Sequence, residues 1–208
     1  MLPYPVVTPW WIQSLYPSCI WELPPGDGNV YLTFDDGPDP VITPYVLDTL
    51  REFGAKATFF CIGKNVQAHP ALYERILDEG HAVGNHTHTH PDGWTTPVED
   101  YLSDVETASV RIRSDLFRPP YGRITRSQIK RMRKRDGGTR IVMWTLLSGD
   151  FDSRLSGEGC VRNVLNHLRP GAIVTFHDSV KAAERLRHTL PVVLNAMEEK
   201  EWKAVAID

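Results

Sequence analysis

The chain has 208 residues, with 23 basic and 26 acidic side chains and a formal charge of −3. This length suits one domain, or at most two small ones, and can bury a core without disulfide staples. Hydrophobic residues at 41% and charged residues at 24% are ordinary globular values, which exclude disordered, collagen-like and coiled-coil chains. The small acidic charge gives no reason to expect a nucleic-acid partner.

Short apolar runs alternate with amphipathic stretches along the chain. In chain order we predict strands over 30–34, 57–62, 81–86, 116–118, 141–147, 172–177 and 202–207. Helices are predicted between them over 43–54, 72–79, 98–116, 126–135, 160–168 and 182–199. The first of these begins at Thr43, a good N-cap, followed by Pro44. This alternation favours a parallel α/β barrel or open sheet, in which chemistry lies at the carboxyl ends of the strands.

Five of the predicted strands end in ionisable groups, although the strand interiors are apolar. In chain order the groups are Asp35 and Asp36, the histidines 86, 88 and 90, Arg118, Asp150 with Asp152, and His177 with Asp178. Two histidines and a carboxylate form a common catalytic zinc set with a position open for water. Structural alternatives stay open: a turn for Asp-Asp-Gly-Pro, a solvated histidine loop, a salt bridge for Arg118 and a packed His177.

The ordered motifs resemble those of the polysaccharide deacetylases, the chitooligosaccharide deacetylase homology domain or carbohydrate esterase family four. The motifs are 33–38 (Thr-Phe-Asp-Asp-Gly-Pro), 86–90 (His-Thr-His-Thr-His), 118–122 (Arg-Pro-Pro-Tyr-Gly) and His177. The resemblance implies a single-domain, distorted (β/α) barrel with seven or eight parallel strands. The catalytic domain would span 29–208, with an N-terminal extension over 1–28 packing on the barrel. The implied activity is metal-dependent removal of N-acetyl or O-acetyl groups from an N-acetylglucosamine-containing carbohydrate.

The resemblance also assigns roles to single residues and leaves His88 without one. It implies Asp35 as general base, Asp36, His86 and His90 as metal ligands, Arg118 as partner of the base, the Tyr121 backbone N–H as oxyanion donor, His177 as general acid, and Asp150 as the group that keeps His177 protonated. The implied cofactor is a divalent metal, with zinc favoured and cobalt, nickel or iron binding similar donors.

Three positions depart from the family motifs. Leu147 replaces the first Asp of the fourth motif, Phe151 replaces its Trp, and Thr175 replaces the Leu of the fifth. These changes are expected to affect which substrate is bound rather than the binding of the metal. The alternatives are a metal-dependent hydrolase of C–N bonds in a non-sugar amide, and a non-catalytic carbohydrate-binding homologue.

The remaining features bear on partners and location. No stretch approaches 18 apolar residues, so no transmembrane helix is expected, and the first 21 residues lack the pattern of a signal peptide. This favours a cytoplasmic monomer acting on an acetylated carbohydrate, with a trimmed secreted or cell-envelope protein as the alternative. Basic residues over 126–135 favour a solvated outer helix over a nucleic-acid or anionic-membrane patch. The aromatic run over 9–21 favours packing across the barrel's open end over a membrane interface. Trp94 is expected either to stack against a sugar ring beside the metal or to cap a loop.

Overall fold

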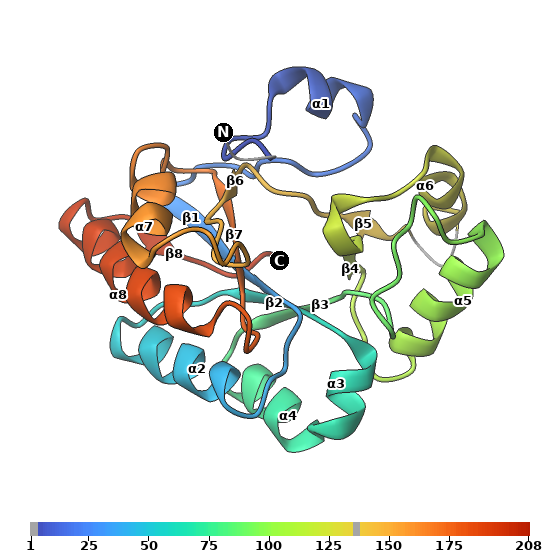
Figure 1. Cartoon of the computed structure of the whole chain (residues 1–208), viewed down its shortest axis with the longest axis horizontal. Coiled ribbons are helices and arrows are strands. Elements are labelled where there is room, and N and C mark those ends of the chain that lie inside the picture. The colour runs from blue at the N-terminus through green and yellow to red at the C-terminus, as the bar shows by residue number, and fades with distance from the viewer. Residues whose placement is uncertain (1–3, 135–137) are drawn as a thin grey trace.

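The computed structural model describes residues 4–134 and 138–208 of the chain. Seven strands follow one another in a curled parallel sheet in the order β5-β4-β3-β2-β1-β7-β6, and β8 pairs with the first residues of β1 (Figure 1). The strands are β1 (Asn29–Asp35), β2 (Thr58–Cys61), β3 (Ala82–Asn85), β4 (Leu116–Phe117), β5 (Arg140–Ile141), β6 (Leu146–Leu147), β7 (Ile173–His177) and β8 (Lys203–Ala204). The predicted distorted barrel of parallel strands is confirmed.

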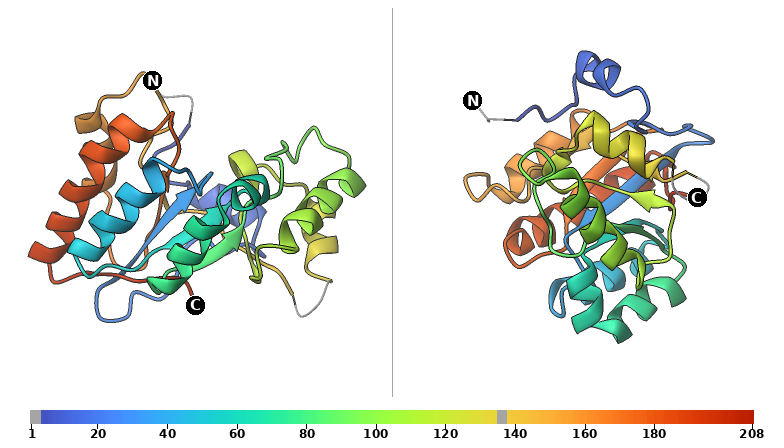
Figure 2. Two further views of the ribbon diagram at one scale, coloured as in Figure 1. Left: turned by 90° about the horizontal axis from the view of Figure 1, so that it is seen from below. Right: turned by 90° about the vertical axis from the view of Figure 1, so that its right-hand side faces the viewer.

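Helices cover the outside of this sheet. They are α1 (Trp10–Leu15), α2 (Ile42–Glu52), α3 (Gly63–Ala68), α4 (Pro70–Asp78), α5 (Val98–Ser109), α6 (Arg126–Met132), α7 (Gly157–Leu165) and α8 (Ala183–Glu199), with a 3₁₀ turn at Pro120–Gly122. Helices α7, α8, α2 and α4 follow one another around one side (Figures 1 and 2). None of the helices within 4–134 and 138–208 is long and apolar enough to cross a membrane.

The core lies between these helices and the sheet, and its centre is aromatic. Phe34 on β1 stacks against Phe59 on β2 and Phe176 on β7, with ring centroids 5.1 and 5.8 Å apart. Strand β1 is buried at six of its seven positions, as expected for a central strand that has both faces covered. The strand that ends in Asp35 is therefore buried within the core along almost its whole length.

The predicted strand over 141–147 is wrong as a single element. Strand β5 pairs with β4 at one edge of the sheet and β6 pairs with β7 at the other, so the barrel is open between them. The N-terminal segment bridges this opening. Ile20 donates its N–H to Ile141 and accepts the N–H of Met143, both at 2.8 Å. The backbone groups of this run therefore pair with a distant segment instead of forming one strand.

Several other boundaries differ from the predictions. Helix α5 ends at Ser109 instead of continuing to 116, because Arg111 and Ile112 both donate their N–H groups to Ala108 in a closing turn. The last predicted strand is only two residues long, and α1 and α3 were not predicted. Helix α6 ends at Met132, and Arg135, the last residue predicted for it, lies outside the described residues.

Candidate active site

Asp35 ends β1 and is held by a completely buried arginine. Arg118, which follows β4, donates from one nitrogen to Asp35 Oδ1 and to Thr33 Oγ1, both at 2.7 Å. Its other nitrogens donate to the carbonyls of Val142 and Met143 at 3.2 and 2.9 Å. A buried guanidinium with this many partners is fixed in position, because leaving its donors unmet would be costly. Asp35 consequently has one defined orientation.

Asp36, His86 and His90 form a compact group of possible metal ligands. Asp36 Oδ1 lies 3.7 Å from His86 Nε2 and 3.3 Å from His90 Nε2, and one donor atom from each residue falls within 4.8 Å of the others. His86 Nδ1 lies 2.7 Å from the carbonyl oxygen of Arg118. A carbonyl only accepts, so Nδ1 carries the proton and Nε2 keeps its lone pair.

The charge states of this group suit a divalent cation. Burial lowers the pKa of His86 to about 4, which leaves its imidazole neutral at neutral pH. Burial opposes the charged form of Asp36, but the hydrogen bond from His90 and the charge of His177 outweigh it and hold the pKa of this carboxyl well below its usual range. Two imidazole nitrogens and one carboxylate are the donors that zinc binds at catalytic sites, so Asp36, His86 and His90 fit such an ion.

The loops that carry these groups contain unusual backbone. Among the described residues, five non-glycine residues have positive φ, and four of them lie here: Asp36 (80°), Thr87 (68°), His90 (62°) and Tyr121 (58°). Such conformations persist where surrounding contacts enforce them, and they gather at functional sites. Here Asn65 donates to the Asp36 carbonyl at 2.7 Å, and Thr87 Oγ1 accepts the His90 N–H at 3.0 Å.

The third histidine of the cluster points away from the other two. The His88 N–H donates to Asp104 Oδ1 at 2.6 Å, and its ring contacts the start of α3, where a Cβ added to Gly63 would lie 2.8 Å from His88 Nδ1. This buried Nδ1 has no hydrogen-bond partner among the described residues. His88 is therefore outside the ligand group.

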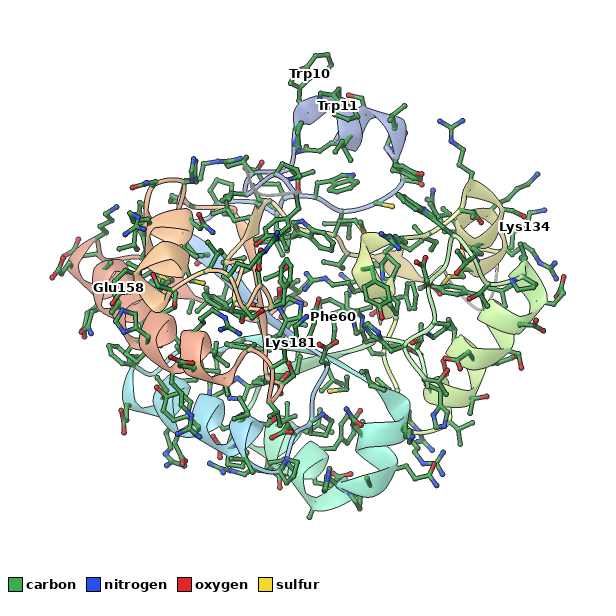
Figure 3. All side chains as sticks on the ribbon, in the orientation of Figure 1. Trp10, Trp11, Phe60, Lys134, Glu158 and Lys181 are labelled. Atoms are coloured by element: carbon green, nitrogen blue, oxygen red, sulfur yellow. The ribbon has the colours of Figure 1, made fainter. Side chains whose placement is uncertain are left out.

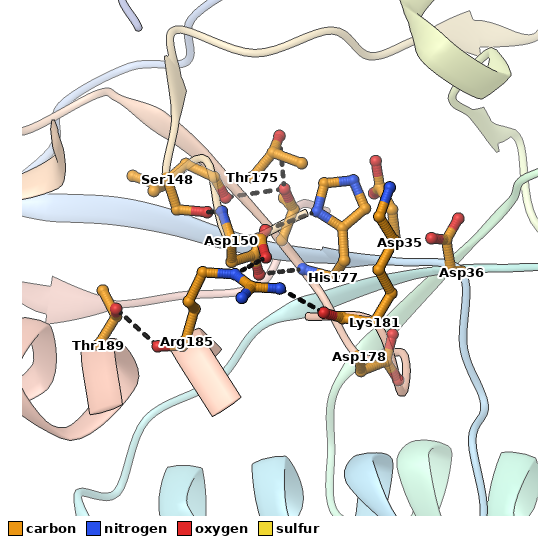
Figure 4. Close-up of polar contacts among 12 residues, drawn as sticks. Asp35, Asp36, Ser148, Asp150, Thr175, His177, Asp178, Lys181, Arg185 and Thr189 are labelled. Carbon is orange, nitrogen blue, oxygen red and sulfur yellow. Dashed lines mark hydrogen bonds and ion pairs between the residues drawn. The ribbon is translucent and has the colours of Figure 1, made fainter. Parts of the chain in front are cut away.

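His177 ends β7 and lies directly beside Asp35 in the sheet register. Asp150 is completely buried and binds His177 twice: Oδ1 lies 2.8 Å from the ring Nδ1, and Oδ2 accepts the backbone N–H at 2.8 Å (Figure 4). Arg185 donates to the Asp150 carbonyl at 2.6 Å. Burial disfavours the imidazolium, but the charge and hydrogen bond of Asp150 outweigh it and raise the pKa of His177 to about 9.

Tyr121 is placed by the turn that follows β4. Its ring packs edge-on against His90, with centroids 4.6 Å apart. Within the described part of the chain its backbone N–H has no acceptor, whereas the N–H groups of the next two residues bond to Pro119 and Pro120. The positive φ of Gly122 and its close approach to Trp144, which a Cβ would meet at 2.4 Å, require glycine here. The turn therefore presents one unpaired donor beside the ligand group.

Asp178 was noted in the sequence at the end of a strand, but no role was predicted for it. Asp178 is completely buried behind the Asp-Asp-Gly-Pro turn, where its Oδ1 accepts the Gly37 N–H at 3.0 Å and its Oδ2 accepts the Thr43 hydroxyl at 2.5 Å. Its own N–H donates to the Asp35 carbonyl at 3.1 Å. Thr43 is thus not the predicted N-cap, since α2 begins at Ile42. The only feature of the sequence that pointed to Asp178 was its position as an acidic residue directly after an apolar strand.

These groups open into one cavity of about 650 Å³. Asp35, Asp36, His86, His90 and His177 line it together with Tyr121, and the three positions that depart from the family motifs, Leu147, Phe151 and Thr175, line it as well. Figure 4 shows Lys181 extending past Asp35 and His177.

Two other walls of the cavity are largely aromatic or apolar. Trp94 and Tyr121 are exposed at its edge, with the Arg123 guanidinium 5.0 and 5.8 Å from their ring centroids. The N-terminal segment supplies side chains that include Ile12 and Tyr16. The structure therefore brings together the predicted site residues from five strand ends, either lining the cavity or, as with Arg118 and Asp150, directly behind it.

Comparison with known proteins identifies relatives that match most of the chain. The family profile described as polysaccharide deacetylase matches residues 22–137. A peptidoglycan-N-acetylglucosamine deacetylase of Bacillus cereus is 33% identical over 193 residues, which cover 90% of each chain. A chitooligosaccharide deacetylase of Bradyrhizobium sp. is 41% identical over 166 residues, which cover 76% of this chain and 74% of the relative. The crystal structure of the Bc1960 peptidoglycan N-acetylglucosamine deacetylase superposes with a TM-score of 0.87 at 28% identity, covering 96% of this chain and 95% of the other.

Proposed function

Because this chain belongs to the polysaccharide deacetylase family, we propose that it removes N-acetyl groups from a carbohydrate that contains N-acetylglucosamine. The curated relatives, which are deacetylases of peptidoglycan and of chitooligosaccharides, support this substrate class. The observation that carries the proposal is the placement of Asp35 and His177. They end adjacent strands in register and, with Asp36, His86 and His90, line one cavity.

Asp36, His86 and His90 would hold a divalent metal, for which zinc is our first choice. When bound, such an ion supplies Lewis-acid polarisation of the acyl oxygen and lowers the pKa of a bound water. The protein contributes the orientation of the ligands, because the Arg118 carbonyl fixes the tautomer and the ring position of His86.

Asp35 is the proposed general base, and Arg118 keeps it in one orientation. It accepts the proton of the water that attacks the amide carbonyl, and the Arg118 guanidinium stabilises its charged form before that transfer. The carbonyl oxygen gains negative charge as the carbon becomes tetrahedral. The unpaired Tyr121 N–H is the protein donor placed to bind it, and one such donor is typically worth about 10²–10³ in rate.

His177 is the proposed general acid. An amine leaves poorly unless it is protonated, so cleavage of the C–N bond requires a proton at the nitrogen. The raised pKa keeps His177 protonated near neutral pH, and the bond between Asp150 and Nδ1 leaves Nε2 to deliver the proton into the cavity. The products are acetate and the free amine of the sugar.

Substitution of the proposed base tests this scheme. We expect Asp35→Asn to lower the rate of deacetylation of chito-oligomers by about 10²–10⁴ while zinc binding persists, because only proton acceptance is lost. His86→Ala is expected to lose both. Acetate release and zinc affinity from calorimetry are the two measurements, and Asp100→Asn, at an exposed acidic position on α5, is the matched control. Wild-type turnover by Asp35→Asn would contradict the assignment, and an inactive zinc-loaded wild type would favour a non-catalytic homologue.

The cavity itself gives reason to test a second substrate class. Thr175 is almost completely buried, and its hydroxyl lies 3.5 Å from that of Thr33, so a polar group stands where the family has leucine. Leu147 and the apolar side chains of the N-terminal segment line the same cavity. A metal-dependent hydrolase of a non-sugar amide is therefore the alternative. Higher kcat/KM for small aryl or alkyl acetamides than for chito-oligomers would favour it.

A further inference from the structure

Two segments that are far apart in the sequence meet at one edge of the barrel. The groove between α1 and α6 is lined by Leu15 and Tyr16 on one side and by Arg126 and Lys130 on the other. The two helices are also tied directly, since an Arg126 guanidinium nitrogen donates to the Leu15 carbonyl at 3.5 Å. The aromatic run and the basic run, treated as separate structural features above, are therefore parts of one surface.

Helix α1 turns large apolar side chains toward the solvent. Trp10, Trp11 and Leu15 are 77%, 53% and 48% exposed, and in Figure 3 the two tryptophans project from the edge of the molecule. Ile12 and Tyr16 take the opposite side of the helix and pack against a buried cluster. Single exposed apolar residues are common, but three on one short helix with two adjacent tryptophans form a ridge that water solvates poorly.

The neighbouring cations have no acidic partners within residues 4–134 and 138–208. Arg126, Lys130, Arg133 and Lys134 are exposed, and none of them lies within an ion-pair distance of 4.0 Å from any carboxylate in the described chain. The contrast is Arg131 on the same helix, which pairs with Glu99. Four uncompensated charges therefore lie beside the apolar ridge, although the whole chain has a net charge of −3.

We propose that this surface, the Trp10-Trp11-Leu15 ridge with the cations of α6, docks the protein on an anionic lipid bilayer. Tryptophan side chains are favoured at the depth of the lipid headgroups, where the ring is partly buried and its N–H stays hydrated. Lysine and arginine beside them attract anionic headgroups, each strengthening binding by about fivefold near such a surface. The ridge projects outward, as insertion between headgroups requires.

Docking in this way has a consequence for the active-site cavity. Helix α1 and the residue that follows it supply Ile12 and Tyr16 to the wall of that cavity, while the outer side of the helix carries the ridge. The docked protein therefore holds the cavity beside the bilayer surface. If the proposed deacetylase function holds, the substrate is a glycan carried on, or close to, an anionic membrane.

Vesicle flotation tests the proposal on the full chain without relying on catalysis. Vesicles of phosphatidylcholine alone are compared with vesicles that contain about one third phosphatidylglycerol, at low and high salt. We expect the wild type to bind the anionic vesicles at low salt. Lys130→Glu/Lys134→Glu is expected to lower the affinity for these vesicles by at least about 25-fold, because two cations are removed. Trp10→Ser/Trp11→Ser is also expected to bind them more weakly. The matched control, Arg111→Glu/Arg113→Glu, makes the same change of net charge before β4 and is expected to bind as the wild type does.

The other outcomes separate this proposal from its rivals. No flotation with either vesicle would overturn it. Binding to heparin or duplex DNA that is at least as tight as binding to anionic vesicles would also overturn it, if Lys130→Glu/Lys134→Glu abolishes that binding and Trp10→Ser/Trp11→Ser does not. A dimer that dissociates in Trp10→Ser/Trp11→Ser, without vesicle binding, would assign the ridge to a second copy and also overturn it. Unchanged circular dichroism and unchanged hydrolysis of soluble chito-oligomers by both variants would show that the fold and the catalytic site are intact. A failure to bind vesicles would then overturn the docking proposal without affecting the proposed function.

Discussion

His177 lies between two opposing influences on its proton. Burial favours the neutral ring, while the buried Asp150 carboxylate favours the imidazolium and prevails, which raises the pKa to about 9 from about 6.5 in an unfolded chain. The folded state therefore binds this proton more tightly than the unfolded state does. The resulting stabilisation is fully present below about pH 6.5 and is lost as the pH rises through about 9.

This balance predicts a specific response to substitution of Asp150. In the metal-free protein we expect NMR titration of the imidazole to give a pKa near 9 for His177, and Asp150→Asn to lower it. The alkaline limb of the kcat/KM profile should move to lower pH in the same variant, since the acid loses its proton earlier. Asp152→Asn is the control, because Asp152 pairs with Arg154 instead. An unmoved limb in Asp150→Asn would remove His177 from the role of acid.

Asp178 supports the turn that carries Asp35 and Asp36, through the backbone on either side of it. Asp178→Ala would leave the Gly37 N–H and the Thr43 O–H without acceptors in a buried site, which we expect to lower the free energy of unfolding by about 1–3 kcal/mol. We also expect weaker zinc binding, measured by calorimetry, because the turn that carries Asp36 is released. Asp178→Asn keeps an acceptor for Gly37 and should recover most of the zinc affinity. Equal zinc affinity in wild type and Asp178→Ala would restrict Asp178 to a structural role.

Comparing Asp178 with the residues that were given a role shows which properties of a site residue a sequence pattern can predict. Asp35, His86 and His177 were predictable because each follows an apolar strand, and parallel strands bring their carboxyl ends to one edge. Asp178 has the same kind of position, yet its side chain turns behind the loop. The direction of a side chain beyond a strand end depends on backbone torsions, such as the positive φ of Asp36, that no hydrophobic pattern encodes.

Among the predicted elements, the single strand over 141–147 is wrong. The barrel is open there between β5 and β6, and we call this opening, which the N-terminal segment bridges, the seam. The run over 141–147 is apolar except at Thr145, and its side-chain pattern resembles that of a continuous buried strand. Several of its backbone hydrogen-bond partners, however, lie more than 100 positions earlier, such as Val6 and Ile20. Hydrophobic periodicity reports which faces are buried and carries no information on which segment supplies the pairing groups.

Thr145 joins this seam to the rest of the sheet. Its buried hydroxyl donates to the Trp21 carbonyl at 2.8 Å and accepts the Ile173 N–H at 3.1 Å. Thr145→Val keeps the shape but leaves both groups unmet, so we expect a loss of about 1–3 kcal/mol in urea unfolding. The comparison is Thr107→Val, where an exposed hydroxyl bonds within α5. Similar losses in the two variants would mean that the seam is no more critical than a surface helix.

For the whole molecule, the ligand group predicts that metal and folding are coupled. An ion that binds only the folded state at 100 times its Kd stabilises it by about 2.7 kcal/mol. For a chain of this size that raises Tm by roughly 5–11 °C. We expect zinc to produce such a shift, EDTA to reverse it, and His86→Ala to show neither, all followed by calorimetric melting. A zinc-induced shift of the same size in His86→Ala would locate the bound ion elsewhere.

The seam also sets the order in which the molecule can be assembled on the ribosome. Trp21 and Thr145 are 124 positions apart, and Thr8 bonds to the Trp144 carbonyl across 136 positions. The N-terminal segment therefore leaves the exit tunnel well before the seam residues to which it bonds have been synthesised. Contacts of such long sequence separation form slowly, so closure of the seam is expected to be the last step of folding. Until then the segment remains accessible to chaperones and proteases, which makes its burial a marker of the completed fold.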